Sequence, residues 1–456
     1  MNKLLSGITY KIVLLLSCIS PITTMAQTDK EFYGRPSYWR PYDKSGINVF
    51  ETSKTPDSMA FEGPRVRIGA GFTQQYQNLK SKNTASNNQG INKLYPISAG
   101  FMTAMANLFV DIQLAEGIRL NVTTYLSTRH HNEAWVKGGY IQFDKLPFKS
   151  KFWNKFMDVA TIKVGHMEVN YGDAHFRRSD AGQTLYNPFM ESYIMDAFAT
   201  EIGGEVLLQK NGLFGMVALT GGMIKGNVDS ATQGMVNGNV VDANTNRNPS
   251  IILKGGFDKQ LSDKLRVRVS GSLYHNSSNA GSGLTLYGGD RAGSNYQNVI
   301  EKWKDATGAT QASTTIAFSG RLNPIFTKKV NAVMLNGFLK AGGLELFGTY
   351  ETAKGRSKTE KNERTASQLA GDVVYRFGNT ENYFVGARYN TVKAQLNGIA
   401  NDVKVDRVSL AGGFFLTKNI LMKGEYVVQN YKDFPTTDYR TGGKFHGYVI
   451  EAVIGF

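Results

Sequence analysis

Stretches of about ten residues in which apolar and polar side chains alternate recur along the chain from residue 64 onward. The clearest examples are residues 65–76, 118–126, 265–274 and 369–377. In the first of them, Val66 and Ile68 alternate with Arg65 and Arg67. Because successive side chains of a strand point to opposite faces, each stretch predicts a β-strand with one apolar and one polar face.

The composition agrees with a protein made of strands. The chain of 456 residues holds 49 Gly, 26 Phe and 22 Tyr but only 11 Pro. Glycine and aromatic residues weaken helices, whereas a large sheet with aromatic residues at membrane interfaces suits them. Beyond the first residues, no apolar stretch approaches the length of a membrane-spanning helix.

The first 26 residues have the pattern of a signal peptide. Lys3 and Lys11 precede or flank a short apolar run, and small residues follow it, with cleavage expected between Ala26 and Gln27. The only cysteine, Cys18, lies inside the run, and a lipid-modified Cys18 is the alternative interpretation. Removal of this segment leaves a mature chain without disulfide or thiol chemistry.

Short and long connections alternate between the predicted strands. Short turns are expected at 115–117, 210–212, 260–264, 378–381 and 417–419, and longer polar connections at 79–97, 171–200, 224–249, 276–312, 355–366, 393–403 and 431–444. A soluble sandwich or propeller shares the alternating strands, but short inner turns and long outer loops are typical of outer-membrane barrels. The sequence therefore predicts an all-β fold, a transmembrane antiparallel β-barrel over residues 64–456.

Sixteen strands are predicted, with eighteen as the main alternative. They are expected at 64–78, 98–113, 118–128, 135–145, 160–170, 201–210, 213–223, 250–259, 265–275, 313–321, 343–354, 367–378, 382–392, 404–416, 420–430 and 445–456. Residues 331–340 also look like a strand, but counting them gives an odd number, and bacterial single-chain barrels have an even one. Residues 322–342 are therefore assigned to an inner connection.

The last strand predicts closure of the barrel. Tyr448, Ile450, Ile454 and Phe456 share one face, and Glu451 lies on the other. A barrel has no open edge, because unpaired backbone groups find no water in lipid. A terminal strand ending in phenylalanine also resembles the signal that the assembly machinery of Gram-negative outer membranes recognises. The predicted location is the cell outer membrane, in contact with lipid and lipopolysaccharide.

Two segments fall outside the strand pattern. Residues 27–63 show no period, and we expect an irregular N-terminal segment, either periplasmic or inside the barrel. The third outer loop, residues 171–200, mixes charged with apolar side chains, which predicts a loop folded into the lumen and packed on its wall. The predicted pore-constriction residues in this loop are Asp173, His175, Arg177, Arg178 and Asp180.

The run "KVGHMEVNYGDAHFRRSD", followed by "EIGGEVLLQKNGLFGMVALTGG", resembles the corresponding region of the phosphate-selective and related porins of Gram-negative bacteria. About 60 residues carry this resemblance at the level of motifs. It implies a trimeric, passive diffusion channel. Anion specificity in that family rests on rows of arginine and lysine in the pore, and no such row can be aligned residue by residue in this chain.

Charge supports an anion preference independently of the resemblance. Alternation places a set of basic residues on the predicted lumen side: Arg65, Arg67, Arg119, Lys163, Arg266, Arg268, Arg376, Arg388, Arg407 and Lys423. Fewer acids share that side: Glu345, Asp372, Glu425 and Glu451. Basic pore walls favour anions. The alternative hypothesis is that Arg177 and Arg178 pair with acids and only hold the loop in place.

Other functions have weaker support. The six histidines show no zinc spacing, and no nucleophile signature occurs. We therefore predict a porin for small hydrophilic solutes, without enzymatic activity, cofactor or metal. An oligosaccharide channel, a barrel enzyme and an adhesin are the alternatives. The basic run 354–364 is expected on an outer loop, facing lipopolysaccharide phosphates or water and not nucleic acid.

Overall fold

The computed structural model describes residues 39–54, 60–127, 134–148, 150–179, 184–224, 228, 230–279, 283–288, 295–312 and 318–456. The predicted signal peptide and the predicted constriction residue Asp180 lie outside these residues. Among the helices of the described part, none has the length and apolar character needed to cross a membrane.

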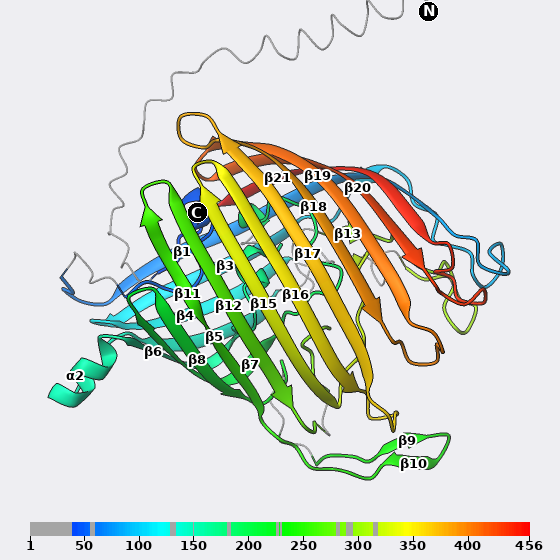
Figure 1. Cartoon of the computed structure of the whole chain (residues 1–456), viewed down its shortest axis with the longest axis horizontal. Coiled ribbons are helices and arrows are strands. Elements are labelled where there is room, and N and C mark those ends of the chain that lie inside the picture. The colour runs from blue at the N-terminus through cyan, green and yellow to red at the C-terminus, as the bar shows by residue number, and fades with distance from the viewer. Residues whose placement is uncertain are drawn as a thin grey trace, which may run out of the picture. The chain divides into compact units, whose positions relative to one another are not determined.

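Sixteen long antiparallel strands form the wall of a closed barrel (Figure 1). They are β1 (Arg65–Lys82), β3 (Met105–Ala115), β4 (Ile118–Ser127), β5 (Trp135–Phe143), β6 (Ala160–Glu168), β7 (Thr200–Lys210), β8 (Leu213–Thr220), β11 (Ser250–Ser262), β12 (Leu265–Asn276), β15 (Lys329–Ala341), β16 (Leu344–Arg356), β17 (Arg364–Phe377), β18 (Tyr383–Ala394), β19 (Val403–Thr417), β20 (Ile420–Lys432) and β21 (Lys444–Gly455). The last strand pairs with the first from Gly71↔Gly455 to Lys82↔Lys444, which closes the sheet. The prediction of a sixteen-stranded transmembrane barrel is confirmed.

Short elements lie before and between the wall strands. They are η1 (Lys44–Gly46), β2 (Gly100–Phe101), α2 (Lys151–Met157), η2 (Ala174–Arg177), η3 (Thr184–Tyr186), the hairpin β9 (Gly234–Val236) with β10 (Asn239–Asp242), and the pair β13 (Tyr296–Gln297) with β14 (Phe318–Ser319). The strand β2 extends the pairing of β1 beside β3. Only the two-residue β2 joins the barrel sheet among the described short elements, whereas β9 with β10 and β13 with β14 form separate pairs.

One predicted strand is wrong, and the segment rejected in its place is correct. Residues 329–341 form the wall strand β15, which pairs with β12 and β16 along its whole length. Within the predicted strand 313–321, the described residues contribute only Phe318–Ser319, in a pair that is separate from the barrel. The predicted number of sixteen strands is still correct, because β15 takes the place of the strand predicted at 313–321. The connection from β12 to β15 is thus a single long one, residues 277–328.

Short turns and long connections alternate around the barrel as expected. We call the end of the strands that carries the short turns the turn side, and the opposite end the loop side. On the turn side, Gly342 and Gly343 join β15 to β16, and Lys418 and Asn419 join β19 to β20. The connection from β5 to β6 is the long exception on this side, and it holds α2.

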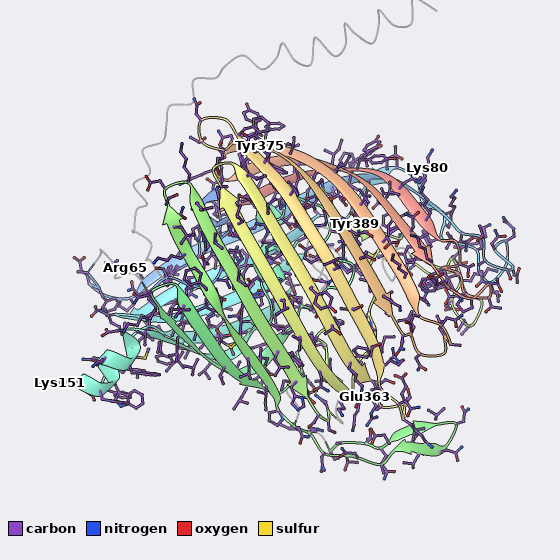
Figure 2. All side chains as sticks on the ribbon, in the orientation of Figure 1. Arg65, Lys80, Lys151, Glu363, Tyr375 and Tyr389 are labelled. Carbon is purple, nitrogen blue, oxygen red and sulfur yellow. The ribbon has the colours of Figure 1, made fainter. Side chains whose placement is uncertain are left out.

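The two faces of the wall differ in polarity. On β1, Val66 and Ile68 face outward at 56% and 61% exposure, whereas Gln75 and Gln77 face inward at 4% and 5%. Outward-facing aromatic rings mark both ends of the apolar belt. Near the turn side, Tyr375, Phe377, Tyr383 and Phe414 stack in a row, and toward the loop side lie Tyr350, Tyr389, Tyr426 and Tyr448. Tyr375 and Tyr389 are labelled in Figure 2. Aromatic girdles flanking an apolar band are the mark of a barrel in lipid.

Candidate functional site

The connection between β6 and β7, residues 169–199, contacts strands on the far side of the barrel; we call it the inner segment. Its described residues are almost all buried. Five of its backbone amides donate to side chains of the wall, because a buried N–H group needs an acceptor. The acceptors are Ser272 on β12 for Gly172 (3.0 Å), Asn336 on β15 for Asp173 (2.9 Å), Gln368 on β17 for Met195 (2.8 Å), Asn390 on β18 for Ile194 (2.7 Å) and Glu425 on β20 for Met190 (3.0 Å).

The wall also donates to carbonyl groups of the inner segment. Arg388 donates to the carbonyl oxygen of Glu191 at 2.8 Å, and Arg407 to that of Ser192 at 2.7 Å. Lys423 donates to three carbonyl oxygens of residues 184–189, at 2.9 to 3.2 Å. These three basic side chains therefore serve a buried backbone on this side of the barrel.

A second segment, residues 39–54, crosses the turn side; we call it the N-terminal strap. Tyr42 donates to Asp111 on β3 at 2.8 Å, and Asn48 donates to Glu345 on β16 at 2.6 Å. Lys44 donates its backbone amide to the carbonyl oxygen of Lys418, in the turn between β19 and β20. Lys54 donates to the carbonyl oxygen of Ala160 at 2.8 Å. The strap thus makes contacts from β20 to β6, across the width of the barrel.

A buried ion network joins the strap, the inner segment and the wall. Lys254 on β11 lies 2.9 Å from Glu51 of the strap and 2.8 Å from Asp173 of the inner segment. Arg268 on β12 contacts the same two carboxylates, each at 2.7 Å. Burial alone would raise the pKa of Glu51, but Lys254 and Arg268 lower it to about 2. The same two cations outweigh burial at Asp173 and hold its pKa well below its usual range.

The predicted constriction residues are brought together but are themselves paired. Arg177 is 3% exposed, donates to Asn48 and lies 3.7 Å from Glu345. Arg178 donates to both carboxylate oxygens of Asp196, at 2.9 and 3.1 Å, and stacks on Phe198. The ring of His175 contacts Glu168 and, 3.0 Å away, Asn170.

The predicted wall cations all lie on the inward-facing positions of their strands, and most contact an acid. The pairs are Arg119–Asp111 (3.4 Å), Lys163–Glu205 (3.3 Å), Arg266–Asp258 (2.7 Å), Arg268–Asp173 (2.7 Å), Arg376–Glu345 (2.8 Å), Arg388–Asp372 (2.7 Å) and Lys423–Glu451 (3.0 Å). Arg65 donates to the carbonyl oxygen of Ala60 at 2.8 Å, and Arg67 lies over the ring of Tyr42. Alternation thus predicted the inward face but placed too few acids on it.

A cavity of about 180 Å³ lies between the strap, the inner segment and the inward face of β3 to β7. Its basic side chains are Arg119, Lys137 and Lys163, from three adjacent strands, together with Arg40 of the strap. Aromatic rings also line it: Tyr42, Phe50, Phe109, Tyr140 and Phe176. We call the part of the wall formed by β4, β5 and β6 the open wall, because its inward side chains border this cavity.

Sequence reasoning missed several cavity residues because two strand irregularities break the alternation. The pairing of β4 with β5 shifts between Thr123 and Thr124. Lys137, which alternation assigns to the outer face with Ile141, lines the cavity instead. On β6, Gly165 has a φ of 145°, and beyond it His166 lines the cavity. Glycine readily adopts a positive φ, and a glycine inside a strand often marks a bulge. Gly165 was therefore the one sign in the sequence that the alternation changes at His166.

The described part of the chain holds no cluster of three or more His, Cys, Asp or Glu side chains arranged to bind a metal ion.

The sequence analysis also missed Arg40 and Glu51 of the strap, but for another reason than Lys137. They belong to an irregular segment, for which no periodic pattern indicates a face or a partner.

No model of a known protein family matches the sequence, and no curated protein matches it either. Solved structures do match in fold. The anion-selective porin from Comamonas acidovorans has a TM-score of 0.50 at 10% sequence identity, and the match covers 86% of this chain and 100% of that one. The outer membrane channel DcaP of Acinetobacter baumannii has a TM-score of 0.48 at 11% identity, over 87% of this chain and 99% of that one.

The likeness to the Comamonas protein shows that the chain has the fold of an outer-membrane porin. The apolar belt and its aromatic girdles are what a bilayer requires of a closed barrel. The chain is therefore a β-barrel of the cell outer membrane.

Proposed function

We propose that the barrel is a porin, a passive channel for small hydrophilic solutes that prefers anions. One observation carries this proposal: the cavity left by the loops is bordered by four basic side chains, Arg40, Arg119, Lys137 and Lys163. Basic side chains along a narrow, low-dielectric passage concentrate anions and exclude cations. Glu51 and Glu168 also line the cavity, but Glu51 is paired with Lys254 and Arg268. Glu168, Asp111 and Glu205 reduce the field of the four cations, and Asp111 contacts Arg119 while Glu205 contacts Lys163.

The solute would pass along the open wall. The predicted pore residues therefore fall into two groups, those that border this path and those that do not. Arg119 and Lys163 border the cavity and would face the solute. The other predicted wall cations contact acids, rings or carbonyl groups and would hold the strap and the inner segment in place. This geometry favours a holding role for Arg268, Arg388 and Arg407 above all.

We propose that the inner segment narrows the lumen. His175 lines the cavity and would form part of the constriction. Asp173, Arg177 and Arg178 would act as positioning residues, because each is buried against an opposite charge. The role predicted for Asp180 stays a prediction. The same proposal includes phosphate-like anions as solutes and a homotrimeric assembly. It also includes recognition of the last strand by the assembly machinery and the expectation that the barrel catalyses no reaction.

Conductance across a planar bilayer under a salt gradient tests the channel and its preference together. We expect stable openings and a reversal potential on the anion side. Replacement of two of the three open-wall cations, Arg119→Gln with Lys163→Gln, should move the reversal potential toward the cation side, because their acid partners Asp111 and Glu205 would remain. The matched control is Arg388→Gln with Asp372→Asn, which removes a charge pair away from the cavity and should leave the reversal potential unchanged.

Two outcomes would contradict the proposal. A folded barrel that gives no openings would exclude a porin, and would favour an enzyme or an adhesin. Openings whose selectivity is unchanged by the open-wall double variant would exclude the cavity as the ion path. The fold of each variant is checked by circular dichroism.

The aromatic rings of the cavity favour one narrower candidate, a channel for anions that carry a ring. Tyr42 and Phe109 stack with ring centroids 4.2 Å apart, and Tyr140 lies beside Arg119 and Lys163. Aromatic faces beside cations suit acidic sugars, since rings stack on the apolar side of a sugar while cations bind its carboxylate. Block of the ionic current by glucuronate, and not by glucose, would support this candidate.

A further inference from the structure

Lysines gather on the outward face of the barrel at the loop-side ends of adjacent strands. They belong to β18, β19, β20, β21 and β1, and are Lys393, Lys404, Lys432, Lys444, Lys80 and Lys82. Several stand directly opposite one another across the strands, at Lys393↔Lys404, Lys404↔Lys432 and Lys82↔Lys444. We call this set the lysine row. Like charges at directly opposed positions destabilise a sheet, so the row requires neutralising partners.

Part of the row is neutralised within the chain. Lys393 lies 2.9 Å from Asp402, and Lys432 lies 2.7 Å from Asp406. Asp406 also contacts Lys404, at 3.5 Å. Each row lysine on β18, β19 and β20 therefore contacts an acid, with Asp406 shared by two of them.

The seam between β1 and β21 differs from the rest of the row. Lys80, Lys82 and Lys444 have no carboxylate within 4.0 Å among the residues that the structure describes. His446 stands opposite Lys80, so an imidazole lies beside the three lysines of the seam. We call Lys80, Lys82, Lys444 and His446 the seam cluster. Its positive charge is balanced by nothing in the described chain.

The basic run 354–364 is the instructive contrast. It was predicted to face lipopolysaccharide phosphates or water, and three of its five cations contact acids of the chain. Lys354 lies 3.8 Å from Glu363, Arg356 lies 2.8 Å from Asp242, and Arg364 lies 2.5 Å from Glu360. Local sequence charge does not record the acids that the fold brings to this loop, and the role expected for the run stays a prediction.

The seam cluster lies just beyond the loop-side end of the apolar belt. Tyr448, on the same outward face as Lys444, lies four residues closer to the turn side, which is about 13 Å along a strand. Tyr76 and the 80% exposed Phe101 form an edge-to-face pair below Lys80. Figure 2 shows Lys80 and Arg65 at opposite ends of β1. Cations thus stand over aromatic and aliphatic side chains, at the level where a bilayer has its headgroups.

We propose that the seam cluster binds the phosphate groups of a phosphorylated glycolipid in the outer leaflet, while Tyr76, Phe101, Tyr448 and Ile450 contact its acyl chains. The position decides in favour of a lipid over a free phosphate. The cluster faces outward and continues the lipid-facing belt, so a ligand there is presented to the bilayer and not to the cavity. The proposal does not depend on whether the barrel conducts ions.

Lipid binding to the full-length folded barrel tests this directly. The probe is a bis-phosphorylated, acylated glucosamine disaccharide, titrated into the barrel in neutral detergent and followed by native mass spectrometry. We expect Lys80→Gln with Lys82→Gln and Lys444→Gln to weaken binding on the order of 100-fold, because each lysine near an anionic headgroup contributes roughly 1 kcal/mol. The matched control is Lys210→Gln with Lys259→Gln and Lys264→Gln, three exposed lysines at turn-side ends of β7, β11 and β12, and it should bind like the unaltered barrel.

Each other outcome would overturn the proposal. Equal weakening in the control triple variant would indicate a general effect of net charge. Equal binding of the same glycolipid without phosphates would exclude the headgroup phosphates as the ligand. Full displacement by millimolar inorganic phosphate would indicate a free-anion site. Circular dichroism of both triple variants shows that each retains its barrel, so that lost binding is not lost folding.

Discussion

The two sides of this barrel use the same kind of inward side chain for different purposes. On β15 to β20, inward arginines, amides and carboxylates bond to the backbone of the inner segment. On the open wall, inward side chains of the same types border a cavity. Arg388 and Arg119 both point inward, yet Arg388 donates to a buried carbonyl group, whereas Arg119, which is 4% exposed and paired with Asp111, borders the cavity.

The difference teaches that inward charge is not the same as pore charge. A loop packed against a barrel wall has unpaired amides and carbonyls, and a buried backbone group without a partner is costly. We call the side formed by β15 to β20 the filled side. Its polar and basic residues are therefore required by packing alone. Only the side that the loops leave uncovered can present charge to a solute.

Removal of the N-terminal strap should have the largest effect. Deletion of residues 39–54 takes away the contacts that cross the turn side, from Lys44 to Lys54. The barrel wall stays closed, because its strand pairing does not involve the strap. We expect a several-fold rise in single-channel conductance with weaker anion preference, since Arg40 is lost while Asp111 and Glu345 become uncovered.

The control for this deletion is Ser45→Ala, on the exposed part of the strap. Among the residues that the structure describes, the Ser45 hydroxyl bonds to Asp43 alone, within the same turn. Its conductance should equal that of the unaltered barrel. If the deletion also leaves conductance unchanged, the strap does not restrict the pore, and the inner segment alone must set the limit.

Much of the fold could be predicted from the sequence, because alternation directly records which side of a wall strand meets lipid. Val66 and Ile68 face outward and Arg65 and Arg67 inward, as the pattern indicates. The choice of strand 313–321 over 331–340 failed because the parity of the count was used to decide between two patterns. Both choices give sixteen strands, so parity could not separate them.

The site could be predicted only in part, for a physical reason. Alternation assigns a face to a residue but not a partner. Glu51 and Asp173 lie on irregular segments and meet Lys254 and Arg268 only after the barrel has closed. These contacts join residues about 80 to 217 positions apart, and no local pattern records them.

Breaking one ion pair on the filled side and one on the open wall would compare how much each pair contributes to the free energy of unfolding. Arg388→Met leaves Asp372 buried, since the two side chains are 3% and 1% exposed, and should lower the free energy of unfolding by about 3–5 kcal/mol. Lys163→Met leaves Glu205 unpaired; Glu205 is itself 2% exposed, but the Lys163 position next to it borders the cavity and is 21% exposed. Water there can solvate the remaining carboxylate, so we expect a loss of about 1–3 kcal/mol.

Urea-induced unfolding in lipid vesicles measures both losses. The double variants Arg388→Met with Asp372→Leu, and Lys163→Met with Glu205→Leu, serve as controls, because removal of both charges leaves none unpaired. Each should recover part of the stability that its single variant loses. Equal losses for the two single variants would mean that the cavity is as dry as the filled side, and the contrast between the sides would be wrong.

Acid should produce the smallest effect, a partial release of the strap. Because Lys254 and Arg268 outweigh burial, the pKa of Glu51 falls from its usual 4.5 to about 2. A pKa lowered by folding means that the carboxylate stabilises the strap fully above pH 4.5, and that this contribution disappears as pH falls toward 2. Conductance should therefore rise modestly over that window. Glu51→Gln should already show the higher conductance at pH 7 and change less in acid. A variant with the same acid response as the unaltered barrel would show that other carboxylates control the strap, with Asp173, whose pKa is also lowered, as the first to examine.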